Sequence, residues 1–166
     1  KDDSNFLLVD PQGFLRQKDS KNNIILKKTD LDLSDVTAIK INPEEGQNIV
    51  SGSHDEMMLA LQKKGIEYVL LTNKSDVSLL VKNRVYSLKL PNKNIHDTTG
   101  IGDIFCSAFT CTMLKEKDFL WALCFAAGSA QAALESNNVG LQKIPKKGMV
   151  ENNASYFYNL VDFRDL

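Results

Sequence analysis

The sequence contains the stretch Asp97-Thr98-Thr99-Gly100-Ile101-Gly102-Asp103, which leads directly into an apolar run over residues 104–114. Its two glycines tolerate positive φ and leave the backbone bare, so several N–H groups can point to one place. The run that follows contains neither Gly nor Pro, which predicts a buried helix whose first turn includes Gly102 and Asp103. The free N–H groups and the positive end of the helix dipole favour an anion above this loop.

Asp103 has two interpretations in this arrangement. A carboxylate in the first turn of a helix is stabilised by the dipole, so Asp103 can be an ordinary N-terminal capping residue. Alternatively, a carboxylate beside an amide-lined anion pocket can take a hydroxyl proton while the amides hold a phosphoryl group in transfer. Position alone favours the capping role, because capping Asp residues outnumber catalytic ones.

The same stretch, continued by Ile104-Phe105 and Ala108-Phe109, resembles the C-terminal signature of the ribokinase-like (PfkB) carbohydrate kinases. In that family the Asp at the position of Asp103 is the catalytic base. The family's anion hole is the backbone that corresponds here to Gly100, Ile101, Gly102 and Asp103. The resemblance therefore reverses the order of the two interpretations of Asp103.

Composition is that of an ordinary globular protein. The 166 residues are 43% hydrophobic and 25% charged with a formal net charge of −1, which predicts one domain over 1–166 and argues against nucleic-acid binding. The N-terminus is unlike a signal peptide, and no apolar run is long enough to cross a membrane, so we expect a cytoplasmic protein that does not bind membranes. The cysteines Cys106, Cys111 and Cys124 are expected to be small buried hydrophobes.

Patterns along the chain predict an α/β fold. Short apolar runs typical of strands occupy residues 6–9, 24–26, 36–41 and 68–72, and a hairpin at a sheet edge is expected over 77–81 and 84–90. Helices are expected over 54–64, 119–134 and 151–166. We expect a three-layer α/β/α arrangement with a largely parallel sheet, and the resemblance makes it ribokinase-like.

Asn42 and Glu45 lie at a strand-to-helix junction. Pro43 suits the first position of a helix, so the side chains of Asn42 and Glu45 can approach each other across the first turn. An ordinary helix start is the plain interpretation. The resemblance implies more, because the family has an Asn-x-x-Glu here that influences Mg²⁺ and phosphate. It makes Asn42 a nucleotide-site residue, with Glu45 acting on the metal through water.

Other nucleotide-binding candidates follow from the resemblance. The family has a Thr that closes the strand over 68–72, followed after one residue by a Gly, and this pair lines the nucleotide site. The sequence keeps Thr72 but has Lys74 in place of the Gly, where a long cation either crowds the nucleotide or pairs with a phosphate. The small residues around Ser129 predict tight helix packing or contact with a flat ligand, and the resemblance adds Ser129, Asn138 and Gly140 as adenine-side candidates.

The resemblance covers only the second half of the family's pattern. Segments that hold the sugar in the family, and its lid, have no counterpart in the sequence, so we expect a C-terminal fragment of a kinase that is inactive alone. The expected enzyme uses ATP and Mg²⁺ to phosphorylate a hydroxyl of a sugar or sugar-like molecule, and its full-length form can be a homodimer. The alternative is a non-catalytic relative that binds nucleotide or a partner. His96 is expected to be structural.

Overall fold

The structure, a computed structural model, describes residues 5–91, 97–136 and 138–166. The chain divides into two compact units. The first consists of Lys1–Lys74, Ser78–Val85 and Phe163–Leu166, and the second of Ser75–Val77 and Tyr86–Asp162. The expectation that residues 1–166 form a single domain stays a prediction.

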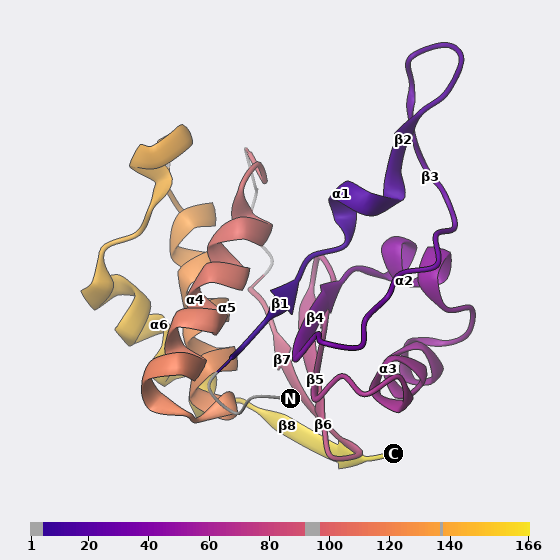
Figure 1. The fold of residues 1–166 in the computed structure, drawn as a ribbon. Coiled ribbons are helices and arrows are strands. Elements are labelled where there is room, and N and C mark those ends of the chain that lie inside the picture. Colours follow the sequence, from indigo (N-terminus) through magenta and orange to yellow (C-terminus); the bar gives the residue numbers. More distant parts are fainter. Residues whose placement is uncertain (1–4, 92–96, 137) are drawn as a thin grey trace. The chain divides into compact units, whose positions relative to one another are not determined.

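The strands form a mixed sheet whose core pairs are parallel (Figure 1). Strand β4 (Ala38–Ile41) pairs in parallel with β1 (Leu8–Val9) on one side and with β5 (Tyr68–Thr72) on the other. The sheet continues through β6 (Asp76–Val81), β7 (Arg84–Lys89) and β8 (Asp162–Asp165). The predicted α/β class with a largely parallel core is therefore confirmed.

The burial of these strands follows their place in the sheet. All residues of β4 are buried, as expected for a central strand of a parallel sheet. Strand β1 ends the strand order and is only half-buried, and the neighbouring Leu7 is 47% exposed, so the strand expected over 6–9 forms only at its second half. Strands β6 and β7 are joined by Lys82 and Asn83, both with positive φ, which suits the twist of a tight hairpin.

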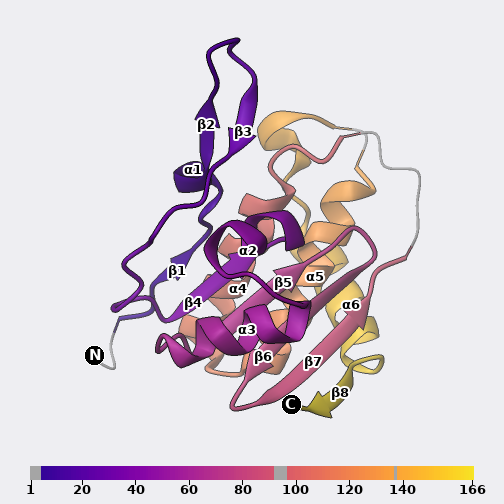
Figure 2. The same ribbon diagram turned by 90° about the vertical axis from the view of Figure 1, so that its right-hand side faces the viewer.

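Two helices of the first unit cover one face of its strands (Figures 1 and 2). Helix α2 (Pro43–Ile49) and helix α3 (His54–Lys63) each begin with a capping box, formed by Asn42 with Glu45 and by Ser53 with Glu56. Such boxes satisfy N–H groups that the first helical turn leaves without acceptors. Apolar side chains from these helices and the strands form one buried core that includes Ile39, Ile49, Met58, Leu61 and Val69.

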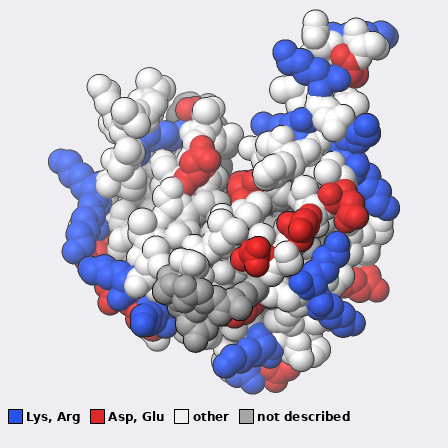
Figure 3. All heavy atoms as spheres, in the orientation of Figure 1, with Lys and Arg blue, Asp and Glu red and all other residues white. Residues whose placement is uncertain are grey.

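A short helix, α1 (Gln12–Leu15), leads into an antiparallel ribbon that the sequence predicted only in part. Strand β2 (Arg16–Lys18) pairs with β3 (Ile24–Leu26), with Gln17 opposite Ile25. Only the second of these strands was expected. Basic side chains, among them Arg16, Lys18 and Lys21, lie exposed along this ribbon (Figure 3).

The second unit is built on three helices, α4 (Ile101–Glu116), α5 (Phe119–Leu134) and α6 (Lys147–Tyr158). Helix α5 has the predicted bounds, and the Asp118 carboxylate accepts the N–H groups of Leu120 and Trp121 at its start. Helices α5 and α6 touch closely at Gly128, because a Cβ there would lie 2.9 Å from the Val150 carbonyl oxygen. The small residues in the middle of α5 thus serve helix packing.

Two further expectations fail in the structure. The segment predicted as one helix over 151–166 is the end of α6 followed by β8, because Arg84 pairs with Asp165 and the N–H of Leu166 donates to the Asn83 carbonyl. Strand β8 lies beyond β7 in the sheet, so the hairpin of β6 and β7 is not at the sheet edge.

The cysteines also differ in burial. Cys124 is buried, Cys106 is half-buried and Cys111 is exposed, so the expectation of three buried cysteines is wrong for Cys111. His96 lies outside the described residues. Within the described part of the chain, every helix is too short or too polar to cross a membrane.

Candidate active site

The predicted anion loop lies at the start of α4. Gly100 is the N-cap residue and has φ 76°, a conformation that glycine adopts without strain. The N–H of Ile101 donates to the Thr98 carbonyl oxygen at 3.2 Å, which closes a turn before the helix. Among the described residues, the N–H groups of Gly100, Gly102 and Asp103 have no hydrogen-bond acceptor. Three candidate donors of the predicted hole are therefore available to an anion.

Asp103 is exposed in the first turn of α4. Its carboxylate forms no hydrogen bond or ion pair with any described residue. In particular it does not cap the helix, since α4 has no side-chain cap. An unpaired carboxylate beside unpaired N–H groups can accept a proton from a group held at the loop.

Asp97 begins the loop and is held from two sides. One carboxylate oxygen accepts the N–H of Thr99 at 2.9 Å and the other accepts a hydrogen bond from Lys143 Nζ at 3.1 Å. These bonds stabilise the charged carboxylate, the Thr99 backbone bond most strongly, and lower the pKa of Asp97 from 3.8 to about 2. Asp97 is therefore charged and structural near neutral pH.

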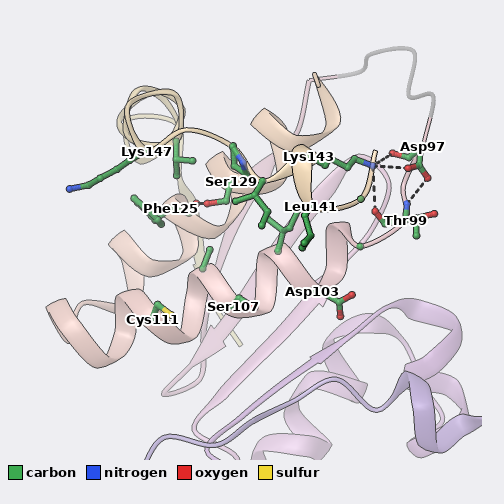
Figure 4. A pocket seen from close by; sticks show the side chains of 17 residues that line it. Asp97, Thr99, Asp103, Ser107, Cys111, Phe125, Ser129, Leu141, Lys143 and Lys147 are labelled. Carbon is green, nitrogen blue, oxygen red and sulfur yellow. Dashed lines mark hydrogen bonds and ion pairs between the residues drawn. The ribbon is translucent and has the colours of Figure 1, made fainter. Parts of the chain in front are cut away.

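Lys143 is a member of this site that the sequence did not indicate (Figure 4). It ends the short 3-10 helix η1 (Gly140–Lys143) and is 3% exposed. Its Nζ donates to the Asp97 carbonyl oxygen at 2.6 Å and to the Thr99 carbonyl oxygen at 3.4 Å, besides the Asp97 carboxylate. Lysine in a polar turn carries no distinguishing signal, and 46 residues separate Lys143 from Asp97.

A cavity of about 630 Å³ adjoins the loop. Asp97, Gly100, Asp103 and Lys143 line it together with Ser129 and Gly140. The rest of its wall is mainly apolar and includes Ile104, Ala108, Phe125, Leu141, Ile144 and Val150. Its size and apolar lining with a few polar groups are those of a small-molecule pocket.

The adenine-side candidates are placed differently from one another. Ser129 is buried in α5, where its hydroxyl donates to the Phe125 carbonyl oxygen at 2.8 Å, and its side chain lines the cavity. Gly140 lines the cavity with φ 59°. Asn138 is exposed, donates to the Gln142 carbonyl oxygen at 3.2 Å and is not part of the cavity wall.

The remaining candidates belong to the first unit. Asn42 and Glu45 are together, since the Asn42 side chain accepts the Glu45 N–H at 2.8 Å and Glu45 accepts the Asn42 N–H at 2.9 Å. Glu45 is 1% exposed and lies 4.0 Å from the ammonium of Lys40, which itself pairs with Asp10 at 2.9 Å. Asn42 and Glu45 both line a smaller cavity of about 340 Å³, together with Arg16 and the residues of β3.

Thr72 is the last residue of β5, and Lys74 lies two residues beyond it. The Thr72 hydroxyl donates to the Ile41 carbonyl oxygen at 3.4 Å and so ties the ends of β4 and β5 together. Lys74 is exposed, and its backbone N–H donates to the Asn73 side chain at 2.7 Å. Its ammonium has no ion-pair partner among the described residues.

The family of the chain follows from a comparison with family models. The model that matches is described as the pfkB family carbohydrate kinase, and it covers residues 14–147. This chain belongs to the pfkB family. The anion loop and Asp103 lie inside the matched range. A search of curated proteins found no significant match.

Solved structures share the pfkB fold of the chain. A pyrophosphate-dependent kinase in the ribokinase family matches with a TM-score of 0.72 and 19% identity over 89% of this chain and 52% of its own. A ribokinase from Thermotoga maritima matches with a TM-score of 0.71 and 17% identity over 90% of this chain and 49% of its own. A ribokinase from Arabidopsis thaliana, complexed with ribose and ATP, matches with a TM-score of 0.60 and 21% identity over 74% of this chain and 42% of its own.

At these identities the likeness establishes the fold. The chain spans about half the length of the solved pfkB relatives it matches. The predicted ribokinase-like class and the predicted family are therefore confirmed.

Proposed function

We propose that this chain carries the nucleotide site and the catalytic base of a kinase that phosphorylates a hydroxyl of a sugar or sugar-like small molecule. The observation that carries the proposal is the carboxylate of Asp103, which has no partner among the described residues and lies in the same helical turn as N–H groups that also have none there. A proton acceptor beside an anion cradle is what phosphoryl transfer to an alcohol requires. Membership of the pfkB family supports the reaction class.

The proposed roles divide the reaction between side chain and backbone. Asp103 takes the proton of the acceptor hydroxyl while the acceptor oxygen bonds to the γ-phosphorus of ATP. The bond between that phosphorus and the β–γ bridging oxygen breaks, and ADP leaves. The N–H groups of Gly100, Gly102 and Asp103 hold the charge on the phosphoryl oxygens. In this scheme Ile101 shapes the loop, because its N–H already bonds to Thr98.

The donor proposed is a nucleoside triphosphate. Support comes from the apolar cavity beside the loop, whose walls at Phe125, Ile144 and Ser129 suit a flat aromatic base. Ser129 and Gly140 would border the base, and Asn42, Thr72, Lys74 and Asn138 are proposed as further nucleotide contacts. The relative from Arabidopsis thaliana was solved with ATP.

Mg²⁺ is the proposed metal, and Glu45 its protein contact through water. Among the described residues, His, Cys, Asp and Glu side chains do not gather in groups of three that could hold an ion alone. That suits Mg²⁺, which binds largely to phosphates and water with one or two carboxylates. Glu45 already accepts the Asn42 N–H, so an indirect contact fits it better than direct coordination. The ion would neutralise charge on the phosphates.

Pyrophosphate is a second candidate donor. It is favoured by Lys74, whose exposed ammonium stands where the family has a Gly and is able to pair with a phosphate. Three of the matched structures are of pyrophosphate-dependent kinases or of a variant of one. A pyrophosphate donor would leave the apolar cavity without a base to bind, which is the argument for ATP.

Calorimetric titration of this chain with Mg²⁺ and a non-hydrolysable ATP analogue tests the donor site, with methylenediphosphonate as the pyrophosphate arm. We expect the ATP analogue to bind with a Kd of roughly 1 μM to 1 mM. Asp103→Asn should bind it at least as well, because a negative charge near the phosphates is removed. Lys74→Gly distinguishes crowding, which it would relieve, from phosphate pairing, which it would weaken. If methylenediphosphonate binds and the ATP analogue does not, pyrophosphate replaces ATP as the proposed donor.

Catalysis is tested with the full-length kinase and a panel of sugars and polyols. Asp103→Asn is expected to lower kcat by roughly 10²- to 10⁴-fold with little change in donor affinity. Wild-type kcat in this variant would refute the role of Asp103. Absence of donor binding and of activity in the wild type would favour a non-catalytic, partner-binding relative.

Cys111 offers an independent readout of cavity occupancy. It is exposed and lines the cavity, whereas Cys124 is buried and desolvation raises its pKa to about 12. Because the thiolate is the reactive form, a thiol reagent should label Cys111 and spare Cys124. A bound donor should slow the labelling of Cys111, and an unchanged rate at saturating donor would place the donor elsewhere.

A further inference from the structure

The ammonium of Lys143 is buried against the loop that carries the N–H donors. Its side chain is 3% exposed, and its contacts are the Asp97 carbonyl oxygen, the Asp97 carboxylate and the Thr99 carbonyl oxygen. A buried charge is stable only where such partners surround it. Figure 4 shows the side chain pointing from η1 to these oxygens.

Lys143 has no N–H left for a ligand. A lysine ammonium has three N–H groups, and Nζ has three oxygen acceptors, at 2.6, 3.1 and 3.4 Å. A direct hydrogen bond to a phosphate would require the loss of one of these bonds. The role of Lys143 is therefore exerted on the loop and not on the bound anion.

The contacts of Lys143 fix the direction of two peptide planes. In a planar trans peptide the C=O of one residue and the N–H of the next point in opposite directions. Because the Thr99 carbonyl points to Nζ, the Gly100 N–H points away from Lys143. The Asp97 carbonyl likewise turns the Thr98 N–H away. A cation on a carbonyl oxygen also polarises the peptide and makes its N–H a stronger donor.

We propose that Lys143 is a positioning residue that acts as a tethered cation, holding the loop from Asp97 to Gly100 so that the Gly100 N–H faces the phosphoryl group before it binds. This inference rests on the proposed function, because it assigns the purpose of the same loop. It explains why a lysine in η1 is buried against backbone oxygens.

The first test replaces Lys143 by Met, which keeps most of its volume and loses the charge and the donors. Titration with the Mg²⁺ complex of the ATP analogue is expected to show binding weakened roughly tenfold or more, since small misplacements of a binding group are costly. Lys146→Met is the matched control, because Lys146 is exposed and does not line the cavity. It should bind like the wild type.

Chemical rescue separates positioning from packing. Lys143→Ala removes three carbons and the ammonium, so n-propylammonium supplies what is missing and 1-propanol supplies the same bulk without charge. We expect propylammonium to raise the donor affinity of Lys143→Ala severalfold. It should not change the donor affinity of Lys143→Met, because the Met side chain fills the space that propylammonium would occupy. Equal rescue by propanol, or wild-type affinity in both variants, would overturn the proposal.

NMR of the free chain keeps the inference testable if the donor does not bind. The Gly100 and Thr98 amide signals of Lys143→Met should shift from their wild-type positions, with thermal unfolding still cooperative. The pKa of Asp97 should rise from about 2 but stay below 3.8, because the Thr99 bonds remain. Unchanged amide signals and an unchanged Asp97 pKa in Lys143→Met would refute the positioning role. Failure of the wild type to bind the donor would refute only the proposed function.

Discussion

At the scale of residues, Asp97 shows how the loop uses charge for structure. Its carboxylate accepts bonds from Thr99 and Lys143, and its pKa falls from 3.8 to about 2. The folded chain therefore binds fewer protons at this site than the unfolded chain between these pH values. The stability that Asp97 contributes is fully present above about pH 4 and is lost as the pH falls toward about 2.

Denaturant unfolding of wild type and Asp97→Asn between pH 2 and 6 measures this contribution. At pH 6 the wild type should be the more stable protein, and the two curves should converge as the pH approaches 2. Other carboxylates titrate in both proteins, so the difference isolates Asp97. A constant difference across the range would show that Asp97 titrates normally in the folded chain.

The residues that the sequence predicted and those that it did not differ in how far along the chain their contact partners lie. Asn42, Pro43 and Glu45 were expected to form a helix start, and they do, because a capping box depends on residues three apart. Lys143 was not found, because its contact with Asp97 depends on tertiary packing. The exposure of Cys111 was missed for a related reason, since α4 is apolar on most sides and its sequence does not mark the side that lines the cavity.

At the scale of elements, α5 and α6 pack at a point that allows no added atom. A Cβ on Gly128 would lie 2.9 Å from both the Ala154 nitrogen and the Val150 oxygen, which are backbone atoms and cannot move aside singly. Gly128→Ala should therefore lower the free energy of unfolding by about 1–3 kcal/mol, even though alanine is the better helix former. Thermal or denaturant unfolding measures the change.

Gly148 in α6 supplies the matched control for that substitution. A Cβ there would have no atom within 4 Å, so Gly148→Ala should be neutral or stabilise the chain by up to about 1 kcal/mol. Equal effects of the two substitutions would mean that the helices separate at Gly128 without loss of stability.

Elements were predicted best where local signals agreed. The bounds of α5 follow from Asp118 as a cap and a largely apolar run, and those of β5 from a short apolar run between turns. The C-terminal segment failed because residues 156–163 have apolar spacing that suits a helix, while pairing with β7 makes the last of them a strand. Sheet pairing is long-range and overrides local pattern.

At the scale of the whole molecule, strand β8 closes one end of the sheet. It pairs beside β7, and Arg84 with Asp165 and Arg164 with Asp55 add exposed ion pairs. Such ion pairs contribute about 0–1 kcal/mol each, so the strand's main effect is to satisfy the backbone groups of β7. Without it the edge of β7 is a template for pairing with another chain.

Deletion of residues 162–166 should therefore promote self-association, which light scattering after size exclusion would detect. The double variant Arg164→Ala, Asp165→Ala keeps the strand and removes its ion pairs, so it should retain the association state of the wild type. An identical mass for the deletion and the wild type would show that β8 does not protect the edge.

The capping box of α2 also has a consequence for how the chain would respond to a metal ion. Glu45 closes the first turn of α2 by accepting the Asn42 N–H, and the same oxygen is the one 4.0 Å from Lys40. An ion that drew this carboxylate away would free the Asn42 N–H and loosen the turn. Direct coordination of Mg²⁺ by Glu45 would then be detected as faster amide exchange at Asn42. An unchanged exchange rate at Asn42 with Mg²⁺ bound would indicate contact through water.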